Sequence, residues 1–434
     1  MSRKNLSFAS TGLVAILSIA LMVGRWSRHP TVRFSEPGRV STLMEVGTAP
    51  MFAVSNAGTQ AVAWVSAPDS GTDGRLYISV GHAPPVELTD SLGPVEAHGE
   101  SPPKLVYSRD GSLNALYVVP KVVPGERFPR AALRFTRSAD GDMTWTAPVS
   151  VTDDAVFGTH NFHAMHAAAD GSLYVSWLDK RGDKTAPYLT RSTDGGKTWE
   201  TNRRVGSGEA CPCCRTAITT AATGTLYVGW RQVNPDSTRD IVISRSDDHG
   251  NTWSDPVRVH NDAWNFPGCP HAGPSLQVDG KQHLHVAWWT GKEGIAGVWY
   301  TRSEDGGKTF VAPIALGVAS YSQPSHVQMA LGPKGEVVVA WDDGTKEVSQ
   351  VVVRVSRDQG RTFGPAEPVS LATRAAGFPV LALSDSTVTV AWSEESAETA
   401  KREKAMMAAM PKNAPMGPHP IGEAQVMVRR GHIS

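Results

Sequence analysis

The stretch Ser192-Thr-Asp-Gly-Gly-Lys-Thr-Trp199 decides the fold, because close copies of it return along the chain. Copies that fit Ser-x-Asp-x-Gly-x-Thr-Trp/Phe begin at Ser246, Ser303 and Ser356, and a fifth, at Ser138, has Asp in place of the glycine. The Asp carboxylate of such a stretch accepts backbone N–H bonds, the glycine permits positive φ, and the aromatic ring packs on the apolar layer beneath. The motif therefore predicts a repeated hairpin turn whose carboxylates are structural.

Strand-like segments that end in a small-aromatic pair recur about every 50–60 residues along the chain. The seven aromatic residues are Trp64, Tyr117, Trp177, Trp230, Trp288, Trp341 and Trp392. The segments are alternating or β-branched and follow Gly or Asp turns, as Leu173-Tyr-Val-Ser-Trp177 follows Asp170-Gly171. This pattern predicts an all-β protein built from seven similar units.

The repeated turns resemble the Asp-box, or BNR, repeats of the sialidase superfamily, over essentially residues 45–434. The resemblance implies a β-propeller in which four-stranded blades surround a central channel. We count seven blades; six is the alternative, because sialidases have six and the first copy lacks the motif. The last copy, residues 378–390 and 425–430, has three strands, so we expect a strand near residues 39–46 to supply the fourth and close the ring.

The amino terminus is set apart from the repeats. Residues 5–24 carry no charge, follow Arg3 and Lys4, and include an apolar run over residues 13–23. This layout is typical of a signal sequence or of a membrane-anchoring apolar helix, and both alternatives stay open. We assign residues 1–30 to this segment and 31–434 to the propeller, and expect the propeller to lie outside the cytoplasm, periplasmic or secreted, with membrane contact through the segment only.

The charge balance limits the kinds of partner. Lys and Arg together number 42, as do Asp and Glu, so the formal net charge of the 434-residue chain is zero. A basic groove for nucleic acid is therefore excluded as a general property. The expected partner is a small molecule, a glycan or a metal ion at the propeller axis.

Cysteine and histidine gather at one register of the repeats. In a propeller, the loops before the innermost strands lie around the axis on one face, so that residues distant in sequence meet there. These loops hold all four cysteines and six of the 14 histidines. The residues are His98, His160, His163, His166, Cys211, Cys213, Cys214, Cys269, His271 and His326. We expect them to converge at one mouth of the axial channel.

Thiolate and imidazole ligands suit copper or zinc, and the Cys-Pro-Cys-Cys spacing lets neighbouring sulfurs share one ion. The predicted metal ligands are Cys211, Cys213, Cys214, Cys269, His271, His163, His166 and His326. The alternative is disulfide bonding, with Cys211 or Cys213 bridged to Cys269, because an exported chain meets oxidising conditions. The sequence leaves open both a metal-binding or redox role for this cluster and purely structural disulfides.

Glycoside hydrolysis is the activity that the family resemblance implies. Sialidases use three arginines, a tyrosine nucleophile paired with glutamate, and an aspartate acid/base. The matching candidates here are Arg215, Tyr321 and Glu209, and Arg215 is the one arginine found clearly before an innermost strand. One arginine does not reproduce three. A binding propeller without chemistry is the third alternative.

An insertion interrupts the last copy at about residues 394–420. It is rich in helix formers, and Met406, Met407, Met410 and Met416 are followed by His419. We predict a helix there, with methionine as packing on its buried side or as a ligand for Cu(I).

Overall fold

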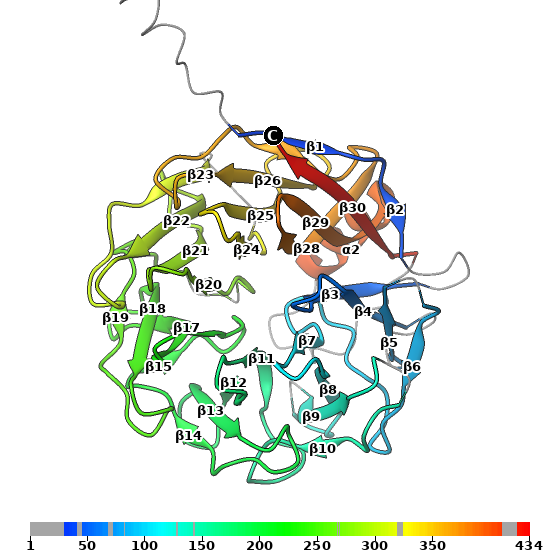
Figure 1. Ribbon diagram of the computed structural model, residues 1–434, viewed down its shortest axis with the longest axis vertical. Helices are drawn as coiled ribbons and strands as arrows, with labels where there is room; N and C mark the ends of the chain where they lie inside the picture. The colour runs from blue at the N-terminus through cyan, green and yellow to red at the C-terminus, as the bar shows by residue number, and fades with distance from the viewer. Residues whose placement is uncertain are drawn as a thin grey trace, which may run out of the picture.

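The computed structural model describes residues 30–40, 46–67, 73–81, 83–126, 129–141, 144–266, 268, 270–318, 324–409 and 423–434. These residues form seven antiparallel sheets of four main strands each, arranged as blades around a central axis (Figure 1). The prediction of a seven-bladed all-β propeller is confirmed, and the six-bladed alternative is wrong.

Each blade runs from an innermost to an outermost strand in chain order. Blade 1 contains β3 (Thr48–Val54), β4 (Gln60–Ser66), β5 (Arg75–Val80) and β6 (Val86–Leu88). Blade 2 contains β7 (Lys104–Tyr107), β8 (Leu113–Lys121), β9 (Arg130–Ser138) and β10 (Val149–Ser150). Blade 3 contains β11 (Asn161–Ala167), β12 (Leu173–Asp179), β13 (Ala186–Ser192) and β14 (Arg203–Arg204).

The next three blades follow the same order. Blade 4 contains β16 (Ala217–Thr220), β17 (Leu226–Val233), β18 (Arg239–Ser246) and β19 (Val257–Arg258), with the short β15 (Glu209–Ala210) also paired to β17. Blade 5 contains β20 (Ser275–Val278), β21 (Leu284–Thr290), β22 (Gly297–Ser303) and β23 (Ile314–Val318). Blade 6 contains β24 (Gln328–Leu331), β25 (Val337–Asp343), β26 (Gln350–Ser356) and β27 (Glu367–Pro368).

Blade 7 closes the ring with strands from both ends of the chain. It contains β28 (Arg374–Ser384), β29 (Thr387–Ser396) and β30 (Gln425–Ile433), and β30 pairs with β1 (Val32–Phe34) and β2 (Gly38–Arg39). The closing strand was expected near residues 39–46, and the pairing with β30 does include Arg39 and Val40, but it begins earlier, at β1. In β1, Val32 is buried, Arg33 is exposed and Phe34 is partly buried, which is the alternation expected of a strand at the outer edge of a blade.

The apolar core lies between the blades. Each of seven clusters of apolar residues contains side chains from two neighbouring blades. Six of the seven repeated aromatic residues on the second strands belong to these clusters, and Trp177, Trp230 and Trp392 are fully buried. Because burying an aromatic side chain stabilises by a few kcal/mol, the spacing of the repeat reflects the packing of each blade on its neighbour.

The motif that predicted the fold closes the turn between the third and fourth strands. In blade 3, Asp194 Oδ1 accepts the backbone N–H of Thr198 at 3.0 Å and Oδ2 accepts its hydroxyl at 2.6 Å, while Ser192 Oγ donates to Oδ1 at 2.8 Å. These hydrogen bonds hold the pKa of Asp194 at about 2, against the opposing effect of burial. The Asp194 carboxylate therefore has a structural role, because it accepts hydrogen bonds within its own turn.

A β-bulge bends the innermost strand of three blades. The bulged residues Ala49, Phe162 and Phe378 all have positive φ, between 52° and 58°. A non-glycine residue in this region costs about 1–3 kcal/mol, which the surrounding packing must offset. The bulges of β11 and β28 bring the rings of Phe162 and Phe378 to within 6.2 and 4.0 Å of histidine rings from other loops.

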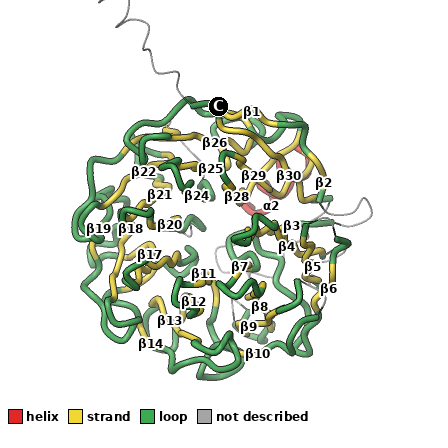
Figure 2. Tube along the Cα trace, in the orientation of Figure 1, coloured by secondary structure: helices red, strands yellow, loops and turns green. Residues whose placement is uncertain are grey.

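Helix is confined to one element of the described residues, α2 (Ala397–Ala409), as Figure 2 shows. It begins directly after β29, where Ser396 Oγ accepts the N–H of Thr399 and caps the helix. The insertion was predicted at about residues 394–420, and its helix begins at Ala397. Residues 410–422 lie outside the described residues. The predicted apolar helix within residues 1–29 also lies outside them. Within the described ranges, no helix has the length and apolar character to cross a membrane.

Candidate functional site

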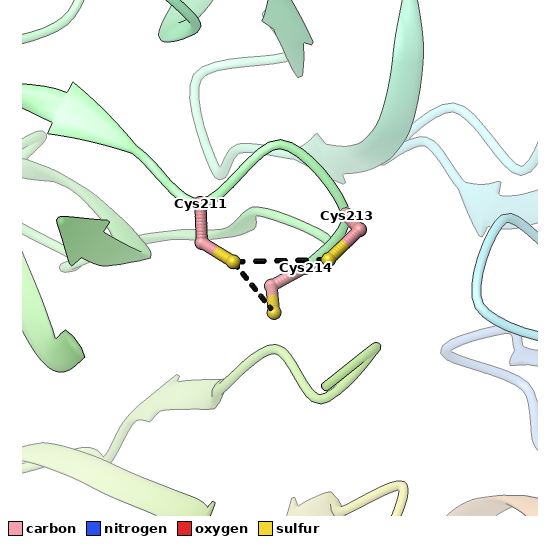
Figure 3. A group of neighbouring side chains, drawn as sticks. All are labelled: Cys211, Cys213 and Cys214. Carbon is pink, nitrogen blue, oxygen red and sulfur yellow. Dashed lines mark hydrogen bonds between the residues drawn. The ribbon is translucent and has the colours of Figure 1, made fainter. Parts of the chain in front are cut away.

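Three cysteines of one loop meet beside the axis. Cys211, Cys213 and Cys214 lie between β15 and β16, and their side chains are buried, with at most 4% exposed. Cys211 Sγ lies 3.7 Å from each of the other two Sγ atoms, and all three lie within 4.8 Å of one another. Figure 3 shows the three thiols turned toward one another. We call this group the trithiol.

The surroundings of the trithiol favour a thiolate. Hydrogen bonds from Cys213 and Cys214, with the nearby charges of Arg239 and Arg231, lower the pKa of Cys211 to about 2. Arg239 Nη1 donates to Cys211 Sγ at 3.0 Å. Burial raises the pKa of Cys214. The loop therefore places the Cys211 sulfur between two other thiols and a guanidinium, an arrangement suited to thiolate chemistry or to a metal ion.

A cluster of three rings adjoins the trithiol. Phe162 packs against the cysteines, and its ring centroid lies 6.2 Å from those of both His98 and His271. The two histidine rings are 5.7 Å apart. All three residues are partly exposed, whereas the thiols are buried. His271, like Phe162, has positive φ, at 49°, so this cluster holds two strained backbone positions.

One buried carboxylate connects the loops that carry these groups. Glu100 Oε2 accepts Arg215 Nη1 at 2.5 Å, and Oε1 accepts the backbone N–H groups of Arg215 and Gly273 at 3.2 and 3.0 Å. Arg215 directly follows Cys214, while Glu100 and Gly273 each follow a histidine of the ring cluster by two residues. Glu100 therefore fixes the cysteine loop and both histidine loops relative to one another.

Arg215, predicted as a substrate-binding arginine, is engaged within the protein. Its Nη1 pairs with Glu100 and its Nη2 donates to the carbonyl of Val327 at 2.8 Å. The cavity beside it, lined also by His326 and Phe378, measures about 10 Å³. That volume holds about one water molecule and no sugar ring.

The other predicted catalytic residues are not assembled with Arg215 in the described structure. Glu209, on β15, forms an ion pair with Lys184, with its Oε2 2.9 Å from Nζ. Tyr321 lies outside the described residues, and so does the predicted ligand Cys269.

Three predicted histidine ligands contact groups other than the cysteines. His326 Nδ1 lies 2.6 Å from Asp342 Oδ2, and His163, fully buried, places Nδ1 3.4 Å from Ser101 Oγ. His166 Nε2 lies 2.8 Å from Thr220 Oγ1. The hydrogen bonds of His166 are at the far end of β11 from Phe162, about 13 Å along the strand.

A larger cavity lies at that far end of the innermost strands. It has a volume of about 710 Å³ and is lined by the turns that follow β7, β11, β16 and β20. Its polar lining includes Arg109, His166 and Asp279. The trithiol and this cavity therefore belong to opposite ends of the axial channel.

Sequence reasoning missed Glu100 and Arg239, whereas the proximity of His98 to His271 agrees with the expected convergence of these loops. The loop containing His98 and Glu100 shares the register of the cysteine loops, which was an available signal. Arg239 begins β18 of the same blade as the cysteines. Nothing local in the sequence indicated that it donates to a thiol.

Comparisons with solved structures agree with the geometry of the fold. A protein of unknown function from Dyadobacter fermentans DSM 18053 is 17% identical with a TM-score of 0.52, over 93% of this chain and 99% of that one. An ulvan lyase solved with -[GlcA(1-4)Rha3S]- bound is 12% identical with a TM-score of 0.55, over 82% and 93%. A Hadza microbial sialidase is 19% identical with a TM-score of 0.46, over 77% and 74%.

Sequence comparison identifies the family. No curated protein matches the chain. The profile of the BNR repeat-like domain matches residues 95–267 and 216–415, which together exceed half of the chain. At these low identities the two structures with TM-scores above 0.5 show the fold alone. With seven antiparallel blades and the repeated turn motif, the chain belongs to the BNR repeat-like domain family and is a sialidase-like β-propeller.

Proposed function

We propose that this propeller binds a soft metal ion, copper or zinc, through Cys211, Cys213 and Cys214 at one mouth of its channel. The observation that carries the proposal is the spacing of the sulfurs. With metal–sulfur bonds of about 2.3 Å, two sulfurs of a tetrahedral site lie about 3.8 Å apart. The two separations of 3.7 Å from Cys211 Sγ fit this value.

The donor set selects the class of metal. Three thiolates are soft ligands that favour Cu(I) or Zn(II) over Mg(II) or Ca(II). The same spacing disfavours a disulfide among the three, because bonded sulfurs lie about 2.05 Å apart. Burial excludes water from the thiolates, which strengthens their interaction with a cation.

The coordination number distinguishes the two metals. Three thiolates suffice for Cu(I), whereas structural zinc takes four ligands. Cys269 is the fourth candidate from the sequence. Arg239 Nη1 donates both to Cys211 Sγ and, at 2.7 Å, to the carbonyl of Gly268, so the residue before Cys269 lies beside the trithiol. His163, His166 and His326 are left out of the proposed site because of their other contacts.

Metal content and thiol counting test the proposal. Protein purified anaerobically from the exported fraction, where residues 1–30 are proposed to direct it, is expected to carry one equivalent of copper or zinc by elemental analysis. Cys213→Ser with Cys214→Ser is expected to abolish binding while circular dichroism stays unchanged. Pro212→Ala, in the same loop, keeps all the sulfurs and serves as the matched control. Cys269→Ser is expected to weaken zinc more than Cu(I) if it is the fourth ligand.

Two results would contradict this function. Unchanged metal stoichiometry in the double variant would remove the trithiol from the site. A thiol count that shows the loop cysteines oxidised in the native protein would favour disulfides. Hydrolysis of sialosides is not proposed, because Arg215 is already paired with Glu100 and the adjoining cavity holds no sugar.

A further inference from the structure

Two histidines from opposite parts of the ring are held at a separation that suits a shared metal ion. His98 precedes β7 of blade 2 and His271 precedes β20 of blade 5, and their ring centroids are 5.7 Å apart. Two imidazoles that bind one ion with metal–nitrogen bonds of about 2.0–2.1 Å have centroids about 5–6 Å apart. Because the two histidines are far apart in the sequence, it is the closed ring of blades that brings them together.

The imidazole pair adjoins the trithiol on its more exposed side. Phe162 packs against the cysteines with its ring 6.2 Å from each imidazole. His98 and His271 are partly exposed, whereas Cys211 is fully buried. A metal ion that arrives from solution therefore meets these partly exposed side chains before it meets the buried sulfurs.

The position of the pair is fixed by the same contacts that fix the cysteines. Glu100 Oε1 accepts the N–H groups of both Arg215 and Gly273, so three loops share one buried acceptor. The close approach of Gly273 to Arg215 leaves no room for a side chain, since a Cβ there would lie 2.3 Å from the Arg215 carbonyl oxygen. The loops that carry the imidazoles and the thiols are thus fixed relative to one another by contacts within the protein.

We infer that His98 and His271 form a second metal position, which receives a soft metal ion and passes it to the trithiol. This inference rests on the proposed function of the trithiol. In the transfer, the metal–nitrogen bonds break as metal–sulfur bonds form. Each thiol that becomes a thiolate ligand releases one proton to water, and the metal keeps its oxidation state, so no oxidant or reductant is needed.

Transfer kinetics test the receiving role. Cu(I) is supplied as its bicinchoninate complex, and the loss of the complex's absorbance is followed by stopped flow under anaerobic conditions. The double variant His98→Ala/His271→Ala is expected to load at least about tenfold more slowly while reaching the wild-type stoichiometry. His432→Ala, an exposed histidine on β30, is the matched control and is expected to load at the wild-type rate. His98→Gln/His271→Gln repeats the test with more conservative side chains.

A second measurement separates this inference from the function on which it rests. In Cys211→Ser/Cys213→Ser/Cys214→Ser, one weaker equivalent of Zn(II) is expected by isothermal calorimetry, and it is lost when His98 and His271 are also replaced. If that histidine-dependent equivalent is present but the wild type shows no thiol-dependent metal, the imidazole position stands and the trithiol function fails. Wild-type loading rates in the histidine variants, with no histidine-dependent equivalent, would overturn the inference and leave the function intact.

Discussion

Glu100 Oε2 and Arg215 Nη1 lie 2.5 Å apart near the propeller axis, and both side chains are almost completely withdrawn from water. The pair joins the loop before blade 2 to the loop before blade 4, and its further hydrogen bonds reach Gly273 and the carbonyl of Val327. Removing two charges from water is costly, but here Glu100 also accepts two backbone N–H bonds and Arg215 also donates to a carbonyl. The ion pair therefore specifies how four blades meet at the axis.

Replacing Glu100 by Gln is expected to lower the free energy of unfolding by about 3–5 kcal/mol, because it leaves a buried guanidinium without its counter-charge. Urea denaturation followed by tryptophan fluorescence measures the change. Glu126→Gln is the matched control, since Glu126 pairs with Arg130 on the surface and such pairs contribute about 1 kcal/mol or less. Equal decreases in the free energy of unfolding of the two variants would show that the axial pair contributes no more than a surface pair.

Gly273→Ala is expected to destabilise the protein by about 1–3 kcal/mol or more, because the new Cβ would overlap the Arg215 backbone at 2.3 Å. The same change should loosen the cysteine loop and increase the rate at which a thiol reagent modifies it. Gly280→Ala is the control, since a Cβ there meets nothing within 4 Å. The expectation fails if both alanine variants unfold at the same urea concentration as the wild type.

The contact between Asp342 and His326 is expected to make a pH-dependent contribution to stability. Asp342, with help from Glu100 Oε2 at 3.9 Å, raises the pKa of His326 against the effects of burial and of Arg215. The imidazolium thus stabilises the fold below its unfolded pKa of about 6.5, and this contribution is lost as the pH rises through the higher folded value. His326 in turn lowers the pKa of Asp342, although burial opposes this.

Asp342→Asn is therefore expected to cost most stability between about pH 4.5 and 6.5, with a smaller difference from the wild type above the folded pKa of His326. Unfolding free energies measured from pH 5 to 9, together with the NMR titration of His326, check this. Asp343→Asn, at the neighbouring position, is expected to leave the His326 titration unchanged. A pH-independent loss in Asp342→Asn would indicate that its hydrogen bonds act without the charge on His326.

The turn motif makes its own prediction. Asp358 accepts the amide and hydroxyl of Thr362 at 2.9 and 2.6 Å and the hydroxyl of Ser356 at 2.7 Å. Asp358→Ala is expected to cost about 1–2 kcal/mol at pH 7. These bonds lower the pKa of Asp358 against the effect of burial, so the loss should shrink as the pH falls below about 3.9. Thermal unfolding at pH 7 and pH 3 measures both, with exposed Asp183→Ala as the control.

The fold could be predicted because its signals are local and repeated. Each Asp-box turn closes within eight residues, and each buried tryptophan occupies the same strand position, so four or five imperfect copies suffice. The closing strand was located only in part, at Arg39, because Val32-Arg-Phe34 is too short to carry a periodic signal. Its identity as a strand depends on β30, which lies at the other end of the chain.

The candidate site could be predicted only in part. The shared register of the loops indicated that backbones would meet at the axis, and the three cysteines of one loop do meet. Side-chain direction does not follow from register, because neighbouring residues of a strand point to opposite faces, and His163 and His166 on β11 contact different partners. The Glu100–Arg215 pair spans 115 residues and has no local signature at all.

The joining of β1 to β30 has a consequence for how the chain is made. Thr31 and Ser434 are hydrogen-bonded across 403 residues, so the first strand synthesised must wait for the last. At about 5–20 residues per second, that interval is about 20–80 s, during which β1 has no strand to pair with. Until release from the ribosome, six blades can pack in succession while the seam stays open, and an open strand edge is where another chain can add. The unpaired edge that β1 leaves until β30 is made is therefore where misassembly during synthesis is most to be expected.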